Sequence, residues 1–261
     1  MRPYLTHEHP IRFAHRGGRG LWPQNTMAAF QGSVDLGYRY IETDVHLSAD
    51  GRVVMFHDDH LDGLTDGAGK VWDHGWSHLA TLDAAYHFDP AAGCPLRGTG
   101  IGIPLFEEAV TTFPNLLWNI DLKQPAIEQA VADEVARLGL EDRVLIGSFH
   151  DHRIGVFRKI TGGRVATSAG PRETAVALAA ALAGRALGGR ADAYQVPERA
   201  GPLKAAGRRF VDAAHRAGKQ VHVWTVNEQA AMHRLLDRGV DGIVTDRPDL
   251  LAEVVREREG R

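Results

Sequence analysis

The chain contains 261 residues, of which 44% are hydrophobic and 24% are charged. This length corresponds to one large domain or two small ones, and the apolar content excludes a disordered protein, because disordered chains have too few apolar residues to bury a core. Lys and Arg number 30 against 33 Asp and Glu, whereas nucleic-acid-binding proteins commonly carry a basic excess. We therefore expect no nucleic-acid partner.

The sequence contains no recognisable targeting or membrane-spanning segment. The N-terminal residues lack the apolar core of a signal peptide, and no run of about 18 apolar residues predicts a membrane span. We therefore expect a cytoplasmic protein without stable membrane insertion. Cys94 is the single cysteine, so it cannot form an internal disulfide. No pattern defines the oligomeric state, and a homo-oligomer is compatible with the sequence.

Short apolar runs alternate with helix-like segments through most of the chain. The first run, 11–15, is followed by a helix predicted over 26–36, which ends before Gly37. Two further runs, 38–47 and 52–57, are separated by a short segment that contains Asp-Gly. Asp-Gly favours a hairpin turn, and so short a connection cannot join parallel strands. The run 52–57 is therefore predicted to return antiparallel beside the preceding one.

Residues 58–102 lose this periodicity and are rich in Gly, Asp, His and aromatic residues. Loops longer than about 15 residues are uncommon in compact domains and are usually functional, so we interpret the segment as an insertion with a short helix near 79–86. Regular alternation resumes after it. Strands are predicted at 116–122, 144–149, 164–168, 193–196, 220–226 and 242–245, and helices at 104–111, 125–138, 150–160, 171–185, 201–217, 228–238 and 248–257.

Counting the hairpin once, eight strands are each followed by a helix, and this alternation predicts a parallel sheet. Eight such units in about 250 residues are typical of a barrel. We predict an α/β protein, a (β/α)8 TIM barrel with a β-hairpin extension of strand 2 and an inserted loop or small subdomain, as a single domain over residues 1–261. An open doubly wound sheet is the alternative, but no G-x-G-x-x-G follows the first strand.

Carboxylates occur at strand positions where barrel enzymes carry their catalytic residues. Glu42 and Asp44 are two residues apart on one strand and so point to the same face. Asp121, on the neighbouring strand, can complete a cluster of three. Oxygen ligands of this kind suit a divalent cation such as Mg²⁺ or Ca²⁺. The alternative is a buried ion-pair network with Arg16 or Lys123, because buried carboxylates must be paired.

Two histidines are predicted to flank this cluster. His15 ends the adjacent first strand, and the hairpin returns His57 to a position opposite or near Glu42. Imidazoles titrate near neutral pH, so this pair can act as general acid and general base. For either histidine alone, a purely structural role is the alternative.

Arg16 and Lys123 add two cations at the same face, and a guanidinium suits bidentate contact with phosphate. Mutual ion pairing is the alternative for Lys123. Trp224 ends the seventh strand and is expected either to form a wall of the pocket or to fill the barrel core. His222, two residues earlier on the same face, is expected to lie deeper in the barrel. Carboxylates, a metal, imidazoles and cations together indicate phosphoryl chemistry.

At these residues the sequence resembles the glycerophosphodiester phosphodiesterase family. Matching segments, in chain order, are Phe13-Ala14-His15-Arg16-Gly17-Gly18, Pro23-Gln24-Asn25-Thr26, Ile41-Glu42-Thr43-Asp44-Val45, His57-Asp58, Asp121-Leu122-Lys123, Trp224-Thr225-Val226-Asn227 and Gly242-Ile243-Val244-Thr245-Asp246-Arg247-Pro248.

The resemblance implies metal-dependent hydrolysis of glycerophosphodiesters to sn-glycerol 3-phosphate and an alcohol. It implies metal ligation by three carboxylates, acid–base roles for two histidines, and phosphate contact by two cations; these residues are Glu42, Asp44, Asp121, His15, His57, Arg16 and Lys123. The sequence departs from the family at Gln24 and Asp121, where glutamate is common. These departures bear on substrate preference and metal choice.

Two alternative functions remain open. One is a related phosphodiesterase that acts on lysophospholipids, as a lysophospholipase D does, or that releases a cyclic phosphate. A bulky lipid needs a wide apolar entrance, which the segment 72–88 is expected to supply. The other is an inactive barrel that binds a phosphorylated ligand; the presence of both histidines and all three carboxylates argues against it.

Overall fold

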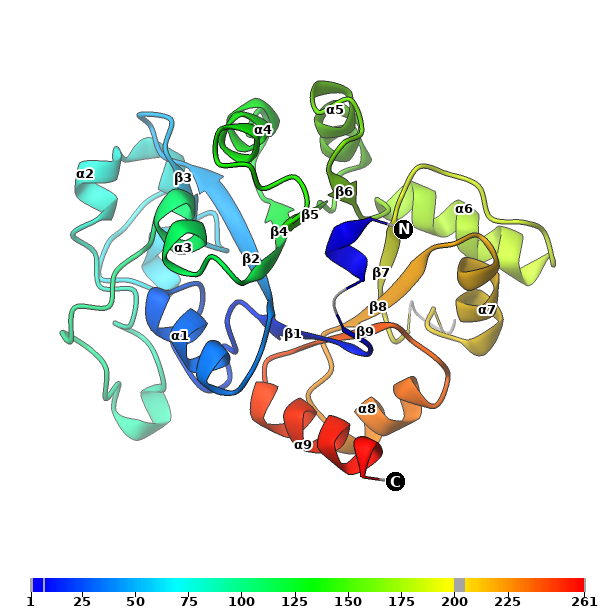
Figure 1. The fold of residues 1–261 in the computed structure, drawn as a ribbon. Helices are drawn as coiled ribbons and strands as arrows, with labels where there is room; N and C mark the ends of the chain where they lie inside the picture. The colour runs from blue at the N-terminus through cyan, green and yellow to red at the C-terminus, as the bar shows by residue number, and fades with distance from the viewer. Residues whose placement is uncertain (1, 7, 200–204, 261) are drawn as a thin grey trace.

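Eight parallel strands form the centre of the protein, and helices surround them (Figure 1). The structure is a computed structural model that describes residues 2–6, 8–199 and 205–260. The parallel strands are β1 (Ile11–His15), β2 (Tyr40–Leu47), β4 (Leu117–Leu122), β5 (Val144–Gly147), β6 (Ala166–Thr167), β7 (Ala193–Pro197), β8 (Gln220–Trp224) and β9 (Gly242–Thr245).

The strands curl into a nearly closed barrel. Their order is β6-β5-β4-β2-β1-β9-β8-β7, and a single parallel bridge between Ser168 and Ala193 joins the two ends of this series. Hydrogen bonds from the Ala169 amide to the Ala193 carbonyl and from the Asp192 amide to the Thr167 carbonyl, both 2.9 Å long, strengthen this junction. The predicted barrel class is confirmed.

The helices follow the strands in the predicted alternation. They are α1 (Met27–Asp35), α2 (Trp76–Leu79), α3 (Phe106–Thr112), α4 (Glu128–Arg137), α5 (Asp151–Ile160), α6 (Pro171–Leu182), α7 (Arg208–Arg216), α8 (Gln229–Leu236) and α9 (Pro248–Glu259). The α1 helix begins where the Thr26 side chain accepts a hydrogen bond from the Ala29 amide, which is the usual arrangement of an N-cap. The predicted helix 201–217 starts only at Arg208, and residues 201–204 lie outside the described ones.

An antiparallel hairpin extends the second strand. The strand β3 (Val53–Met55) pairs with β2, with Val45 opposite Met55. With Ala49-Asp50 at the centre of a two-residue turn, His57 would lie opposite Glu42; instead Gly51 adopts a φ of +78°, which allows a three-residue turn. The register is therefore shifted by one residue, so that Phe56 donates its amide hydrogen to the Asp44 carbonyl at 3.0 Å.

The segment 58–102 has few regular elements, and its Leu61, Val71 and Leu79 form a small hydrophobic cluster with Val54 and Phe56 of the hairpin. The helix predicted near 79–86 is wrong, since α2 ends at Leu79. The reason is Asp83, whose carboxylate accepts from the amides of Ala85 at 2.9 Å and Gly98 at 2.7 Å. A side chain that binds nearby amides in this way stabilises turns at the expense of helix.

Apolar side chains close the end of the barrel opposite the carboxyl ends of the strands. A 3₁₀ turn, Pro3–Leu5, crosses this end (Figure 1), and its Tyr4 and Leu5 are buried among the barrel's interior residues. The Tyr40 hydroxyl donates to the Tyr4 carbonyl at 2.6 Å. Only the opposite end of the barrel is therefore available for a polar cavity.

His222 lies inside the barrel, as expected, where it is fully buried and its ring contacts Phe13. Burial lowers the pKa of His222 to about 3. Because the unfolded chain takes up a proton near pH 6.5 and the folded protein does not, stability is lost as the pH falls from about 6.5 towards 3. In urea titrations, we expect the free energy of unfolding of His222→Gln, relative to that of wild type, to rise as the pH falls from about 6.5 towards 3, because glutamine does not titrate. A constant difference between the two proteins would contradict this account.

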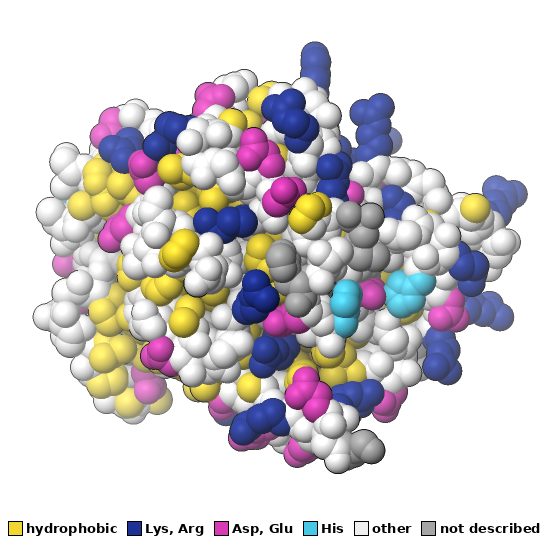
Figure 2. All heavy atoms as spheres, in the orientation of Figure 1, with side chains coloured by type: hydrophobic (Ala, Val, Ile, Leu, Met, Phe, Trp, Pro, Cys, Tyr) yellow, Lys and Arg dark blue, Asp and Glu magenta, His cyan; other side chains and the backbone are white. Residues whose placement is uncertain are grey.

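The face drawn in Figure 2 carries acidic and basic side chains interspersed with apolar ones, without a continuous basic stripe. Within the described residues, no helix is long and apolar enough to cross a membrane.

Candidate active site

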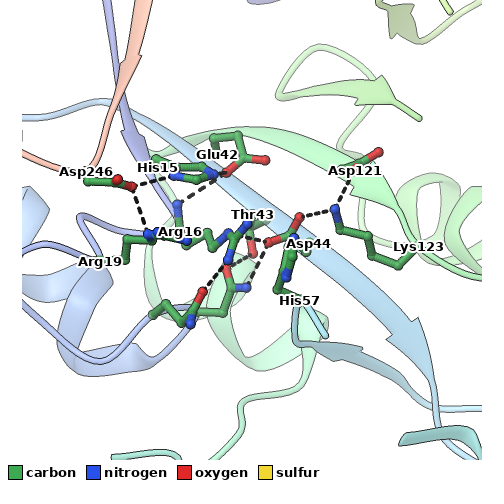
Figure 3. Close-up of polar contacts among 12 residues, drawn as sticks. His15, Arg16, Arg19, Glu42, Thr43, Asp44, His57, Asp121, Lys123 and Asp246 are labelled. Atoms are coloured by element: carbon green, nitrogen blue, oxygen red, sulfur yellow. Dashed lines mark hydrogen bonds and ion pairs between the residues drawn. The ribbon is translucent and has the colours of Figure 1, made fainter. Parts of the chain in front are cut away.

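A cavity of about 590 Å³ opens at the carboxyl ends of the barrel strands. All eight residues singled out in the sequence line it: His15, Arg16, Glu42, Asp44, His57, Asp121, Lys123 and Trp224. Seven of them come from four neighbouring strands, β1 to β4, and the loops after these strands (Figure 3). The eighth, Trp224, ends β8. The barrel thus brings together every predicted site residue, while their individual roles stay predictions.

Asp44 is the centre of the charged network. One of its oxygens lies 2.9 Å from the Lys123 ammonium, and the other accepts from the Asn25 amide at 3.0 Å and lies 3.2 Å from the Arg16 Nε (Figure 3). Burial raises the pKa of Asp44, but Lys123 and Arg16 outweigh it and lower the pKa to about 2. Asp44 is therefore ionised at neutral pH.

Glu42 and Asp121 differ from Asp44 in their environment. Glu42 accepts from the Arg16 backbone amide at 3.2 Å and lies 3.6 Å from the His15 Nε2. Burial and the neighbouring Asp44 raise its pKa well above the usual range. Burial also raises the pKa of Asp121, although Lys123 lies 2.7 Å from it and opposes the shift. Both carboxylates would be stabilised as anions by additional positive charge.

The donor set suits a hard divalent cation, because three largely buried carboxylates from adjacent strands line one cavity and two of them lack full charge compensation. As arranged here, Lys123 instead bridges Asp44 and Asp121. Among the described residues, no group of three or more His, Cys, Asp or Glu side chains converges closely enough to hold a metal. The ion-pair alternative considered from the sequence is therefore present, and a cation requires some rearrangement of these side chains.

Each cavity histidine is hydrogen-bonded to a carboxylate through Nδ1. His15 lies 2.6 Å from Asp246 and His57 lies 2.5 Å from Asp58. Burial lowers the pKa of His15, against the opposing effect of Asp246. The hydrogen bond from His57 lowers the pKa of Asp58. These contacts fix the Nδ1 side of each ring, so that Nε2 is the nitrogen available to exchange a proton with a ligand.

The turn after β1 positions Arg16 in the cavity. Arg16 and Gly17 have φ values of +52° and +76°, and a side chain on Gly17 would place Cβ 2.8 Å from the Cβ of Ala29. Glycine is therefore required where this turn packs on α1. The Arg16 guanidinium also donates to the side-chain oxygen of Gln24 at 2.5 Å. Gln24, one of the two departures from the family pattern, therefore directly contacts a residue that is predicted to bind phosphate.

Several residues of the site were not selected from the sequence. Asp246 follows β9, and its second oxygen accepts from Asn227 at 2.8 Å; its place at a strand end was visible, but its contact with His15 depends on barrel closure. Phe149 lines the cavity, and the centroid of its ring lies 5.5 Å from that of Trp224. The segment 58–102 contributes no residue to the lining of this cavity, but its Ala84, His87 and Phe88 line a second pocket that shares Arg19 with the cavity.

Replacing Asp246 by Asn is expected to lower kcat by about 10- to 150-fold, because a hydrogen bond to a charged group contributes about 1.5–3 kcal/mol. The residual activity should show an altered pH profile, since the amide no longer favours protonated His15. Asp249→Asn is the matched control, because this carboxylate pairs with Arg247 outside the cavity. Equal steady-state rates and pH profiles for the two variants would disprove a positioning role for Asp246.

The barrel and a charged cavity at the carboxyl ends of its strands define a TIM-barrel enzyme. Residues 15–250 match the Glycerophosphoryl diester phosphodiesterase family. The chain belongs to this family, as its sequence motifs predicted, and it is accordingly an enzyme.

Similar proteins cover almost the full chain. A probable glycerophosphodiester phosphodiesterase 2 of Mycobacterium tuberculosis is 37% identical over 97% of this chain and 93% of its own length. A glycerophosphodiester phosphodiesterase of Bacillus altitudinis is 33% identical over 94% and 98%. The crystal structure of a putative glycerophosphoryl diester phosphodiesterase from Silicibacter pomeroyi covers 99% of both chains with a TM-score of 0.80 and 25% identity.

Proposed function

We propose that this protein hydrolyses glycerophosphodiesters to sn-glycerol 3-phosphate and an alcohol, with the help of a divalent cation and two catalytic histidines. The observation that carries the proposal is the shared cavity, in which His15 and His57 lie with three basic side chains and four carboxylates. A family member that retains all of these groups has what phosphodiester hydrolysis requires: charge stabilisation and a proton donor and acceptor.

The basic side chains and the histidines of the cavity have separate roles, phosphate binding and proton transfer. Arg16 and Lys123 bind the anionic phosphate oxygens, because a guanidinium and an ammonium both donate charge-assisted hydrogen bonds. One imidazole takes a proton from the attacking oxygen through Nε2, and the other gives a proton to the departing alkoxide. Asp246 and Asp58 hold His15 and His57 in orientation during these transfers.

Glu42, Asp44 and Asp121 would hold the cation, either Mg²⁺ or Ca²⁺, since all their ligand atoms are carboxylate oxygens. When bound, it would supply positive charge at a phosphoryl oxygen and lower the pKa of the attacking hydroxyl group. The raised pKa values of Glu42 and Asp121 support this assignment, because a cation would favour their ionised forms.

Product identification tests the proposal. Purified protein is incubated with glycerophosphocholine and Mg²⁺ or Ca²⁺, and phosphorus NMR and a choline assay follow the products. We expect sn-glycerol 3-phosphate and choline in equal amounts. Accumulation of a cyclic glycerophosphate would instead identify a cyclising phosphodiesterase. If neither product forms with any phosphodiester, the alternative of a phospho-ligand-binding barrel replaces this proposal.

A further inference from the structure

The lining of the active-site cavity is charged on one side of the barrel and neutral on the other. Within the described chain, every Asp, Glu, Lys, Arg and His of the lining comes from β1, β2, β4, β9, the hairpin or the loops that follow them. The lining from Gly147 to Thr225, which spans β5 to β8, contains no such residue. It does contain polar side chains, and two of them are considered with one from β4. We name Asn119, Ser168 and Gln195 the neutral cluster.

The neutral cluster forms part of one layer of the barrel interior. Side chains alternate along a strand, so residues two positions apart point to the same side. Each member of the cluster follows an apolar interior residue by two positions; these residues are Leu117, Ala166 and Ala193. Gly147 of β5 follows the interior residue Leu145 in the same way. The layer therefore stands directly above the apolar part of the barrel core and faces the cavity.

Two members of the neutral cluster are buried but have no protein partner for their polar atoms. Asn119 and Ser168 are 5% and 3% exposed. Across the described part of the chain, neither the Asn119 amide group nor the Ser168 hydroxyl takes part in a hydrogen bond, and neither is sealed from the cavity. Buried polar groups are nearly always paired in proteins. These two groups are therefore placed to bond to a molecule inside the cavity.

The third member, Gln195, is oriented by His222. The Gln195 amide nitrogen donates a long hydrogen bond to the Nδ1 of His222 at 3.5 Å, while the Nε2 of His222 donates to the side-chain oxygen of Gln220 at 3.0 Å. Burial lowers the pKa of His222 to about 3, so its ring is neutral and accepts at the nitrogen that carries no proton. The oxygen of the Gln195 side chain is thereby left for the cavity.

Gly147 keeps the space between two members of the cluster open. A side chain at this position would place Cβ 3.1 Å from the Ser168 Oγ and 3.4 Å from the Gln195 Oε1. The φ of Gly147 is not positive, so its backbone conformation does not require glycine. A glycine within a strand commonly marks a position where a ligand approaches closely. The two oxygens therefore border one open space in the cavity.

We infer that the neutral cluster binds a hydroxyl group in the alcohol part of the substrate and so contributes to substrate specificity. Amides and hydroxyls both donate and accept hydrogen bonds, as an alcohol does. A phosphate offers acceptors and negative charge, which Arg16 and Lys123 match on the charged side, and a quaternary ammonium group offers no hydrogen bond.

This inference rests on the proposed function and specifies which part of the substrate the neutral side of the cavity holds. The hydroxyl can belong to the glycerol or to the alcohol that leaves. In either case a substrate without it leaves the polar groups of the cluster unpaired, and such groups are the means by which a site rejects an analogue that lacks a hydroxyl.

Pairs of substrates that differ in one hydroxyl test the inference. The first pair, glycerophosphocholine and 2-hydroxypropyl phosphocholine, differs in the terminal hydroxyl of glycerol, and both members release choline. The second pair, the glycerol 3-phosphate esters of ethylene glycol and of ethanol, differs in the leaving alcohol, and both members release glycerol 3-phosphate. The ratio of kcat/KM within a pair measures recognition of that hydroxyl. We expect wild type to favour the hydroxylated member of the pair that matches the binding mode.

Variants assign this recognition to the neutral cluster. Ser168→Ala removes a hydroxyl without a protein partner, and Asn119→Leu removes an amide while nearly keeping the shape of the side chain. Each should lower the kcat/KM ratio of the matching pair about two- to twelvefold, the contribution of one neutral hydrogen bond. Gly147→Ala should act in the same direction, because its methyl group fills the space between two members of the cluster.

The kcat/KM ratio is insensitive to a uniform loss of active protein, so reduced stability alone does not lower it. Should Asn119→Leu fail to fold, Ser168→Ala and Gly147→Ala decide the result. Ser77→Ala is the matched control, because Ser77 is exposed on α2 and does not line the cavity. It should leave both ratios unchanged.

The outcomes separate this inference from the proposed function. A lowered ratio in the first pair places the bound hydroxyl on glycerol, and a lowered ratio in the second places it on the leaving alcohol; either supports the inference. Hydrolysis of glycerophosphocholine with both ratios unchanged in every cluster variant overturns the inference and leaves the proposed function intact. If wild type hydrolyses none of the four substrates, both are overturned.

Discussion

Replacing His57 or His15 by Ala is expected to lower kcat on glycerophosphocholine by about 10²–10⁴-fold, which is the usual contribution of general acid–base catalysis. Both rings lie in the cavity with Nδ1 held by a carboxylate, so each loss removes one proton-transfer group without removing the phosphate ligands. Steady-state kinetics with choline detection measures the effect, and the KM is expected to change much less than kcat.

The control is His60→Ala, because His60 is exposed and does not line the cavity. Its kinetics should equal those of wild type. The double variant His15→Ala/His57→Ala should lose less activity than the product of the two single losses, because residues that act as a unit are not additive. Activity near wild type in either single variant would exclude that histidine from the acid–base pair.

Replacing Lys123 by Gln is expected to lower the free energy of unfolding by about 3–5 kcal/mol in metal-free buffer, as is usual when one partner of a buried ion pair is removed. The ammonium lies 2.9 Å from Asp44 and 2.7 Å from Asp121, so its loss leaves two buried carboxylates facing each other. Urea denaturation followed by circular dichroism measures the change. Mg²⁺ or Ca²⁺ should restore stability more strongly in this variant than in wild type, because the ammonium no longer competes.

Lys159→Gln serves as the comparison, since Lys159 is exposed at the end of α5, and its change should stay within about 0.5 kcal/mol. A Lys123→Gln protein as stable as wild type would mean that protonation of Asp121 already relieves the repulsion. A divalent cation that stabilises both proteins equally would speak against competition between Lys123 and a metal.

The fold was predictable because strand and helix signals alternate along the chain. Eight apolar runs bounded by glycines and caps define the barrel strands, and the structure reproduces their order. The segment 58–102 was not predictable in detail. There, single contacts such as the Asp83 carboxylate with two amides decide the backbone path, and no periodic pattern records them.

The position of a site residue could be predicted where that residue lies on a barrel strand or at its carboxyl end. Glu42, Asp44 and Asp121 lie on adjacent strands, so their proximity follows from the parallel register. The pairing of His15 with Asp246 was not predicted, because a closed barrel makes β1 and β9 neighbours but does not define which side chains at their ends meet. The apolar lining of the cavity was not predicted as a unit for a related reason: residues such as Leu178, Val196 and Trp224 come from a helix and two strands that only the folded barrel brings together.

Metal-dependent catalysis is tested by hydrolysis of glycerophosphocholine by wild-type protein and by Glu42→Gln, first in EDTA and then with Mg²⁺ or Ca²⁺ added. We expect wild type to be inactive in EDTA and to recover with one of the cations, and the variant to recover poorly because one carboxylate ligand is missing. Full activity of wild type in EDTA after exhaustive dialysis would contradict the assignment of the three carboxylates to a catalytic cation.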